Sequence, residues 1–199
     1  TLAASRLMHP HELLTLTVLD LSAGPESRTV CSLRNGSPLV LDLWHTKCVK
    51  CPAALSKLDS IAAKHPDVKF VACALSLCDK SDGPSDEESS REAVVELVDD
   101  MWENLIHCYM TVEDKLKAKA ELGFTSVPFC LVIAADGSIL FKGDPAQVDF
   151  TNVFNTSPSP DSVPGDIKVA EPSLLKPLSE SNHVSSKPAL GFGYDDEDF

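Results

Sequence analysis

The sequence lacks several features that would assign a protein to a class directly. No run of about 18 apolar residues occurs, so we expect no membrane-spanning segment. The first 14 residues include Arg6, His11 and Glu12 and lack the apolar stretch of a signal peptide; whether a leader preceded Thr1 stays open. There is no internal repeat and no second closely spaced cysteine pair to complete a structural zinc site. The seven cysteines, an odd number at irregular spacings, fit a secreted disulfide framework poorly and favour a reducing compartment, which we expect to be the cytoplasm.

Basic side chains are also scarce. The 199 residues include 17 Lys and Arg against 30 Asp and Glu, which gives a formal net charge of −13. Residues 79–103 hold ten acidic and two basic residues, and residues 151–199 hold eight acidic and three basic residues. Because phosphate backbones are bound through Lys and Arg, this balance argues against nucleic-acid binding. The charge is placed in two appendages, and we expect the rest to be a domain of ordinary composition.

The sequence does contain alternating strand and helix patterns. Continuous apolar runs are typical of buried strands, and the expected strands cover 13–20, 29–34, 39–44, 68–77, 105–110, 129–134 and 139–142. Apolar residues at helical spacing predict helices over 52–64, 91–102 and 112–122. We therefore expect an extension over 1–12, an α/β domain over 13–150 with an acidic insertion at about 79–103, and a disordered Pro- and Ser-rich tail over 151–199.

Two of the seven cysteines, Cys48 and Cys51, are spaced as Cys-x-x-Cys. The spacing alone is weak, but the pair directly follows a predicted buried strand and precedes a predicted helix. Cys48 is thus expected at a helix amino terminus, where free N–H groups and the helix dipole favour a thiolate. Cys51 lies one turn later, within reach of the first sulfur. This arrangement suits thiol–disulfide exchange, in which an exposed thiol attacks and a more buried thiol resolves the mixed disulfide.

Two runs carry a resemblance to a known family. Residues 41–51, LDLWHTKCVKC, resemble the active-site segment of the thioredoxin superfamily, and residues 123–133, GFTSVPFCLVI, are similar to its cis-proline region. The segments at 14–33 and 68–110 look more like the redoxin branch than like minimal thioredoxin. The resemblance covers about residues 10–150. It implies an α/β, thioredoxin-like fold with a central mixed β-sheet flanked by α-helices.

The resemblance also implies a role for each matching residue. Cys48 would be the nucleophile and Cys51 the resolving cysteine. Asp42 would be the buried carboxylate behind Cys51, with a pKa raised by desolvation, and would accept a proton during attack. Pro128 would be the cis-proline that faces the disulfide, where the Val127 backbone pairs with an extended substrate.

The sequence departs from the family around the cysteines. Lys47 stands where the family has an aromatic residue, and Val49-Lys50 replaces Gly-Pro. We expect both lysines to favour the Cys48 thiolate and so to make the pair more oxidising. Lys47, Lys50 and Trp44, which would pack under the loop, are assigned to the substrate-binding surface together with Val127 and Pro128.

The remaining candidate residues have simpler interpretations. The cysteines at 31, 73, 78, 108 and 130 are expected to be packing residues, and His45 an exposed loop histidine. We expect neither a metal nor another cofactor. The pair also faintly resembles the copper-chaperone branch of the superfamily, which has three residues between its cysteines instead of two. A peroxiredoxin would need a Thr and an Arg partner that the sequence around Cys48 does not supply.

A second hypothesis is a thioredoxin-fold subunit of a larger assembly with vestigial redox activity. The chain ends in residues 191–199, GFGYDDEDF, where aromatic and acidic residues alternate as in peptides that dock on basic surfaces with apolar pockets. Two departures from the family, Lys47 and the bulk that Phe129 adds after Pro128, would then reflect recruitment to binding. In this alternative the chain resembles thioredoxin-like proteins that associate with the microtubules of the cytoskeleton. The first hypothesis predicts protein thiols and disulfides as partners, and the second a protein that binds the acidic tail. Neither includes a nucleic acid or a membrane.

Overall fold

The computed structural model describes residues 9–19 and 25–155. The predicted tail lies outside the described residues from 156 onward, and so does most of the predicted extension over 1–12.

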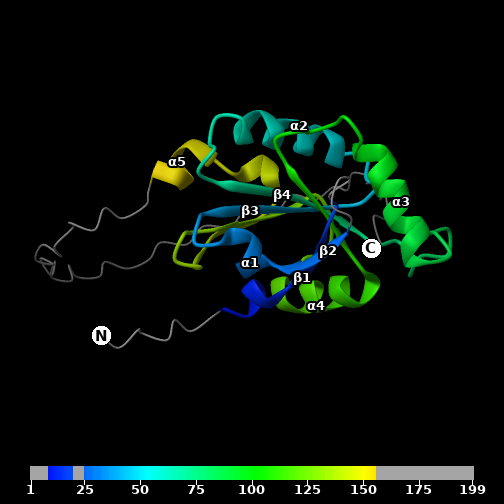
Figure 1. The fold of residues 1–199 in the computed structure, drawn as a ribbon. Helices are drawn as coiled ribbons and strands as arrows, with labels where there is room; N and C mark the ends of the chain where they lie inside the picture. Colours follow the sequence, from blue (N-terminus) through cyan, green and yellow to red (C-terminus); the bar gives the residue numbers. More distant parts are fainter. Residues whose placement is uncertain (1–8, 20–24, 156–199) are drawn as a thin grey trace, which may run out of the picture. The chain divides into compact units, whose positions relative to one another are not determined.

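The core of the domain is a seven-stranded mixed sheet (Figure 1). Its strands in chain order are β1 (Thr15–Val18), β2 (Glu26–Thr29), β3 (Leu39–Trp44), β4 (Lys69–Leu75), β5 (Ile106–Met110), β6 (Phe129–Ile133) and β7 (Ile139–Gly143). They lie in the order β2-β1-β5-β4-β3-β6-β7. The three central strands β5, β4 and β3 are parallel, and each of the other neighbouring pairs is antiparallel. This confirms the predicted mixed sheet of a thioredoxin-like fold.

Helices cover both faces of this sheet. They are α1 (Val30–Arg34), α2 (Cys51–Ala62), α3 (Glu87–Val98), α4 (Val112–Leu122) and α5 (Phe150–Asn155), with 3₁₀ turns η1 (Pro10–Leu13) and η2 (Pro145–Gln147). In Figure 1, α2, α3 and α5 lie over one face, and α1 and α4 lie over the other. Strand β3 is buried along all six residues, because helices pack on both of its faces and strands pair on both of its edges. The chain segment that follows β3 therefore starts from a rigid support.

Local signals fix the ends of α4, whose bounds are those of the helix expected over 112–122. The Thr111 side chain accepts a hydrogen bond from the Asp114 N–H at the amino end, and Gly123 ends the helix in the left-handed conformation at φ 69°. The register of this helix is important for the site, because it turns Lys115 inward.

Two predicted elements are corrected. The strand expected over 29–34 is helix α1, because the Thr29 side chain accepts a hydrogen bond from the Ser32 N–H and so caps a helix. The helix expected over 91–102 begins earlier, at Glu87, because the Asp86 side chain accepts from the Ser89 N–H. Val94 and Val98 of that helix belong to the buried core. The acidic segment over 79–103 is thus part of the packed domain and no appendage to it.

Candidate active site

The cysteine pair lies at the carboxyl end of the central strand. Trp44 ends β3, and after the loop 45–50 helix α2 begins at Cys51. Cys48 and Cys51 form a disulfide with their Cα atoms 5.5 Å apart. Cys48 is half-buried, whereas Cys51 is fully buried. The two sulfurs therefore differ in access in the way that attacking and resolving thiols require.

The start of α2 directs a donor at the accessible sulfur. The Cys51 backbone N–H donates to Cys48 Sγ at 3.2 Å, and the Cys48 N–H donates to the His45 carbonyl at 3.1 Å. An N–H at a helix start stabilises negative charge on the group it faces. Pro52 occupies the first turn of the helix, where the missing N–H interrupts no internal hydrogen bond.

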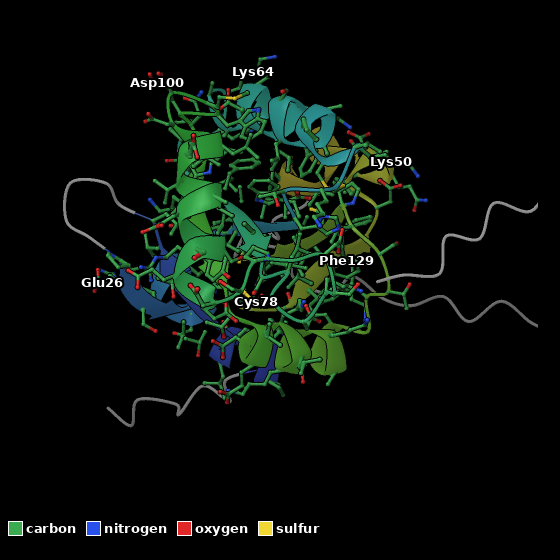
Figure 2. The ribbon with its side chains drawn as sticks, turned by 90° about the vertical axis from the view of Figure 1, so that its right-hand side faces the viewer. Glu26, Lys50, Lys64, Cys78, Asp100 and Phe129 are labelled. Carbon is green, nitrogen blue, oxygen red and sulfur yellow. A yellow bond between two sulfur atoms is a disulfide. The ribbon has the colours of Figure 1, made fainter. Side chains whose placement is uncertain are left out.

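The segment before β6 borders the disulfide on one side. The Val127–Pro128 peptide bond is cis, and the Val127 carbonyl oxygen lies 3.8 Å from Cys48 Sγ. Strand β6 pairs antiparallel with β3, with Phe129 beside Leu43. The Phe129 ring packs on Phe124 with 5.4 Å between ring centroids, so part of its bulk is covered. Figure 2, which views this end of the sheet, labels Phe129 together with Lys50 and Cys78 from the neighbouring segments.

Asp42 lies behind the pair in the middle of β3. Side chains alternate along a strand, so Asp42 shares its face with Val40 and Trp44, which belong to the same core cluster as Cys51. Its side chain is fully buried. Burial, and then the negative charge of Asp144, raises the pKa of the Asp42 carboxyl well above its ordinary value. Its location and the direction of the pKa shift are those expected from the sequence.

Trp44 and His45 support the loop from within. Trp44 is 1% exposed and packs edge-on against Trp102 with ring centroids 6.1 Å apart. It therefore lies under the loop, as expected, but offers no surface to a substrate, contrary to its assignment as a binding residue. His45 is half-buried and not exposed. Burial, and then the charges of Lys115 and Lys80, holds the pKa of His45 below its ordinary value.

The two lysines next to the cysteines differ in their surroundings. Lys47 Nζ forms an ion pair with the Asp82 carboxylate and also donates to the Asp82 carbonyl at 2.7 Å. Lys50 is exposed at the start of α2, beside Val49, which is 91% exposed. The Asp82 carboxylate offsets part of the Lys47 charge, and the effect of either lysine on the Cys48 thiolate stays a prediction.

Sequence reasoning missed the acidic residues that reach this site. Asp82 falls in the acidic insertion expected at about 79–103, and no local signal indicates that it would meet Lys47, 35 positions away in the chain. Lys115 did carry a signal, since it stands in the apolar stripe of its helix with Ala118 and Leu122. A lysine in such a stripe requires a buried partner, and here Lys115 Nζ pairs with Asp79 and donates to the Ser76 carbonyl at 2.6 Å.

The other five cysteines are free thiols. Cys73, Cys108 and Cys130 are buried, and burial raises the pKa of each, for Cys108 to about 12. Cys31 and Cys78 are half-buried. The three buried thiols are protonated at neutral pH and behave as packing groups.

Neither a metal centre nor a membrane span stands out in the part of the chain that the structure describes. Over residues 9–19 and 25–155, no three His, Cys, Asp or Glu side chains are grouped to hold a metal ion. None of the described helices has the length and apolar character needed to cross a membrane.

Comparisons with known proteins find similarity at the level of structure. No protein-family model matches the sequence, and no curated protein does either. A candidate thiol-disulfide oxidoreductase of Bacteroides vulgatus is 16% identical with a TM-score of 0.53, over 76% of this chain and 98% of that one. A thioredoxin-like protein from Aeropyrum pernix is 14% identical with a TM-score of 0.52, over 71% and 87% of the two chains. A candidate thiol:disulfide interchange protein DsbE from Chlorobium tepidum is 15% identical with a TM-score of 0.50, over 67% and 82%.

Proposed function

The chain has a thioredoxin-like fold, and on that premise we propose that it catalyses thiol–disulfide exchange on protein substrates through Cys48 and Cys51. One observation carries the proposal. A half-buried cysteine in the loop that follows β3 is bonded to a buried cysteine in the first turn of α2, and an N–H of that turn is directed at the outer sulfur.

In the reducing direction the reaction has two exchange steps. The Cys48 thiolate attacks one sulfur of a substrate disulfide; the substrate S–S bond breaks, a Cys48–substrate bond forms, and the departing thiolate takes up a proton. The Cys51 thiol then loses its proton, and its thiolate attacks Cys48 Sγ. The mixed disulfide breaks, the Cys48–Cys51 bond forms, and the second substrate thiol leaves. The substrate gains the two electrons that the cysteine pair loses, and the oxidising direction is the reverse.

Asp42 is proposed to accept the proton that Cys51 releases and to return it in the reverse direction. A carboxyl with a pKa raised by burial is suited to this task, because it binds a proton more readily than an ordinary exposed carboxyl does. Its position on the α2 side of β3 places it on the side of the sheet where Cys51 is buried.

The substrate is proposed to bind in an extended conformation along Val127 and Pro128, next to the Cys48 sulfur. The Val127 carbonyl is 3.8 Å from that sulfur, so a backbone N–H of a bound segment could pair there while its disulfide meets Cys48. Val49 and Lys50 add an exposed apolar and cationic surface, which favours acidic residues near the substrate cysteine.

Equilibration in glutathione redox buffers, followed by alkylation and mass measurement, tests the proposal. The expected result is a reversible two-electron couple between roughly −120 and −270 mV, the span of thioredoxin-fold oxidoreductases. Cys48→Ser is the control and should show no couple in this range. A wild-type pair that never closes, or never reopens, contradicts the proposed function.

We propose that the reaction takes place in a reducing compartment, and that this compartment is the cytoplasm. The support is that five of the seven cysteines remain free, two of them half-buried, which suits reducing surroundings. The alternative of a structural subunit of a cytoskeletal assembly depends on the acidic tail, which lies outside the described residues, and no observation here favours it.

A further inference from the structure

The loop between β4 and α3 has a fixed conformation beside the cysteine pair. The Lys80 N–H donates to the Leu77 carbonyl and the Gly83 N–H donates to the Lys80 carbonyl, each at 3.0 Å. A Cβ atom at Gly83 would lie 1.8 Å from the Leu77 carbonyl oxygen, so the loop closes this tightly only with glycine there. Residues 77–83, the acidic loop, thus form a compact turn structure.

A buried lysine fastens the acidic loop to the body of the domain. Lys115, which is 6% exposed, extends from α4 to pair with Asp79 and to donate to the Ser76 carbonyl. Burial alone would raise the pKa of Asp79, but the hydrogen bond and the charge from Lys115 outweigh it, and the pKa lies below its ordinary value. The loop is therefore anchored at a residue three positions before Asp82.

The anchored loop delivers the Asp82 carboxylate to Lys47, the residue immediately before Cys48. Both side chains are accessible, with 45% and 74% of the Lys47 and Asp82 side chains exposed, yet Lys47 makes two polar contacts with Asp82. The hydrogen bond and the charge from Lys47 lower the pKa of the Asp82 carboxyl, which keeps it ionised at neutral pH.

We propose that Asp82 is a positioning residue that acts through Lys47 to set the acidity of the Cys48 thiol. A cation close to a cysteine stabilises its thiolate, and a carboxylate bound to that cation cancels most of its field and fixes its position. Asp82 therefore makes Cys48 less acidic than an unpaired Lys47 would, and so makes the pair less oxidising. The inference rests on the proposed function, because the acidity of Cys48 controls the thiol–disulfide exchange proposed above.

Four proteins separate this role from a general effect of charge: the wild type, Asp82→Asn, Lys47→Met and the double variant. The measurement is the pH dependence of iodoacetamide alkylation at Cys48 in the reduced protein. Tandem mass spectrometry locates the label on the peptide 42–58, which cleavage before Asp42 and Asp59 releases. Glu96→Gln is the matched control, because it removes one exposed negative charge from the α3 surface without touching Lys47.

The expected pKa of Cys48 is lowest in Asp82→Asn, highest in Lys47→Met, and nearly equal in the wild type and the double variant. Below the pKa, Asp82→Asn should react about threefold faster than the wild type, the size of effect expected for one charge near a thiol in a high dielectric. Glu96→Gln should match the wild type. An unchanged Cys48 pKa in Asp82→Asn, or an equal shift in Glu96→Gln, overturns the assignment.

This test can fail independently of the proposed function, since alkylation requires no protein substrate. An unaltered pKa in Asp82→Asn with a normal redox couple rejects the role of Asp82 alone. The predicted order of pKa values without any redox couple contradicts the proposed exchange reaction instead.

Discussion

Asp42 on β3 lies directly opposite Cys130 on β6, and neither oxygen of its carboxylate has a hydrogen-bond partner among the described residues. An ionised carboxylate in such a position is costly, because no donor replaces the water it has lost. Burial, and then Asp144, accordingly raises the pKa of Asp42. The buried Asp42 carboxyl therefore lowers the stability of the domain at neutral pH relative to a side chain that does not ionise.

Replacing Asp42 by Asn should stabilise the oxidised protein at alkaline pH. Because the folded-state pKa is raised, the folded wild type binds more protons than the unfolded chain, and its free energy of unfolding falls as pH rises from about 4 through the folded pKa. The amide does not ionise, so at pH 8 the variant should be more stable by about 1 to 3 kcal/mol. The difference should shrink toward pH 4. Urea unfolding at both pH values measures it.

The exposed Asp67 provides the control for this comparison. Asp67→Asn should unfold like the wild type at both pH values, since its side chain is solvated. A gain in stability of Asp42→Asn that is equal at pH 4 and pH 8 would show that ionisation of Asp42 is not its cause.

The two cysteines should give different defects when each is replaced by serine. Cys48→Ser removes the attacking sulfur and should abolish reduction of a model disulfide such as insulin. Cys51→Ser retains the attack but cannot resolve it, so a mixed disulfide through Cys48 should accumulate and be visible by mass. Cys31→Ser, which removes a half-buried free thiol in α1, should retain wild-type activity. Equal activity in the wild type and Cys48→Ser would exclude the mechanism.

The sequence predicted the parts of the fold whose local and tertiary preferences agree. Strand β3 was found with its bounds because an unbroken apolar run suits a strand buried on both faces. Helix α4 was found with its bounds because apolar residues recur at helical spacing over 112–122. The segment 29–34 was mistaken for a strand, since Val30 and Leu33 fit either pattern. The hydrogen bond from the Ser32 N–H to the Thr29 side chain caps a helix and so decides in favour of helix α1.

The candidate site was predictable to the extent that it is encoded in short motifs. Cys48, Cys51 and Asp42 occupy one continuous run, so their proximity follows from a strand, a loop and a helix. The contacts of Lys47 with Asp82 and of Lys115 with Asp79 join segments more than 30 positions apart. These contacts depend on how the β4–α3 loop closes against its own backbone. No local pattern of charge or hydropathy predicts that closure.

Gly83→Ala should open the acidic loop without unfolding the domain. The added methyl group would meet the Leu77 carbonyl oxygen, which belongs to the backbone and cannot rotate away as a side chain would. We expect a loss of about 2 kcal/mol or more in the free energy of unfolding, and faster hydrogen exchange at the amides of 77–83. Ser81→Ala, an exposed change in the same loop, should leave both unchanged. Unaltered hydrogen exchange in Gly83→Ala would show that the loop accommodates a Cβ atom at position 83, contrary to the short contact with the Leu77 carbonyl oxygen.

The buried ion pair between Glu12 and Arg34 should affect stability and leave the redox chemistry alone. Arg34 Nε and Nη2 donate to Glu12 Oε1 at 3.0 and 2.6 Å, and Arg34 Nη1 donates to the Ala135 carbonyl at 2.6 Å. Both side chains are almost fully buried, and Ala135 lies in the turn after β6, at the opposite end of the sheet from Cys48. Removing one partner leaves the other charge buried and poorly compensated.

Arg34→Met should therefore lower the free energy of unfolding by about 3 to 5 kcal/mol, and Glu12→Gln by a comparable amount. The double variant should recover part of the loss, because it leaves no unpaired charge. Urea unfolding of the four proteins measures the coupling, and the redox potential of the Cys48–Cys51 pair should be the same in all of them. A potential that shifted with Arg34→Met would mean that the η1–α1 end of the domain controls the geometry of the cysteine pair across the sheet. Additive losses in the double variant would mean that Glu12 and Arg34 stabilise the fold through separate partners.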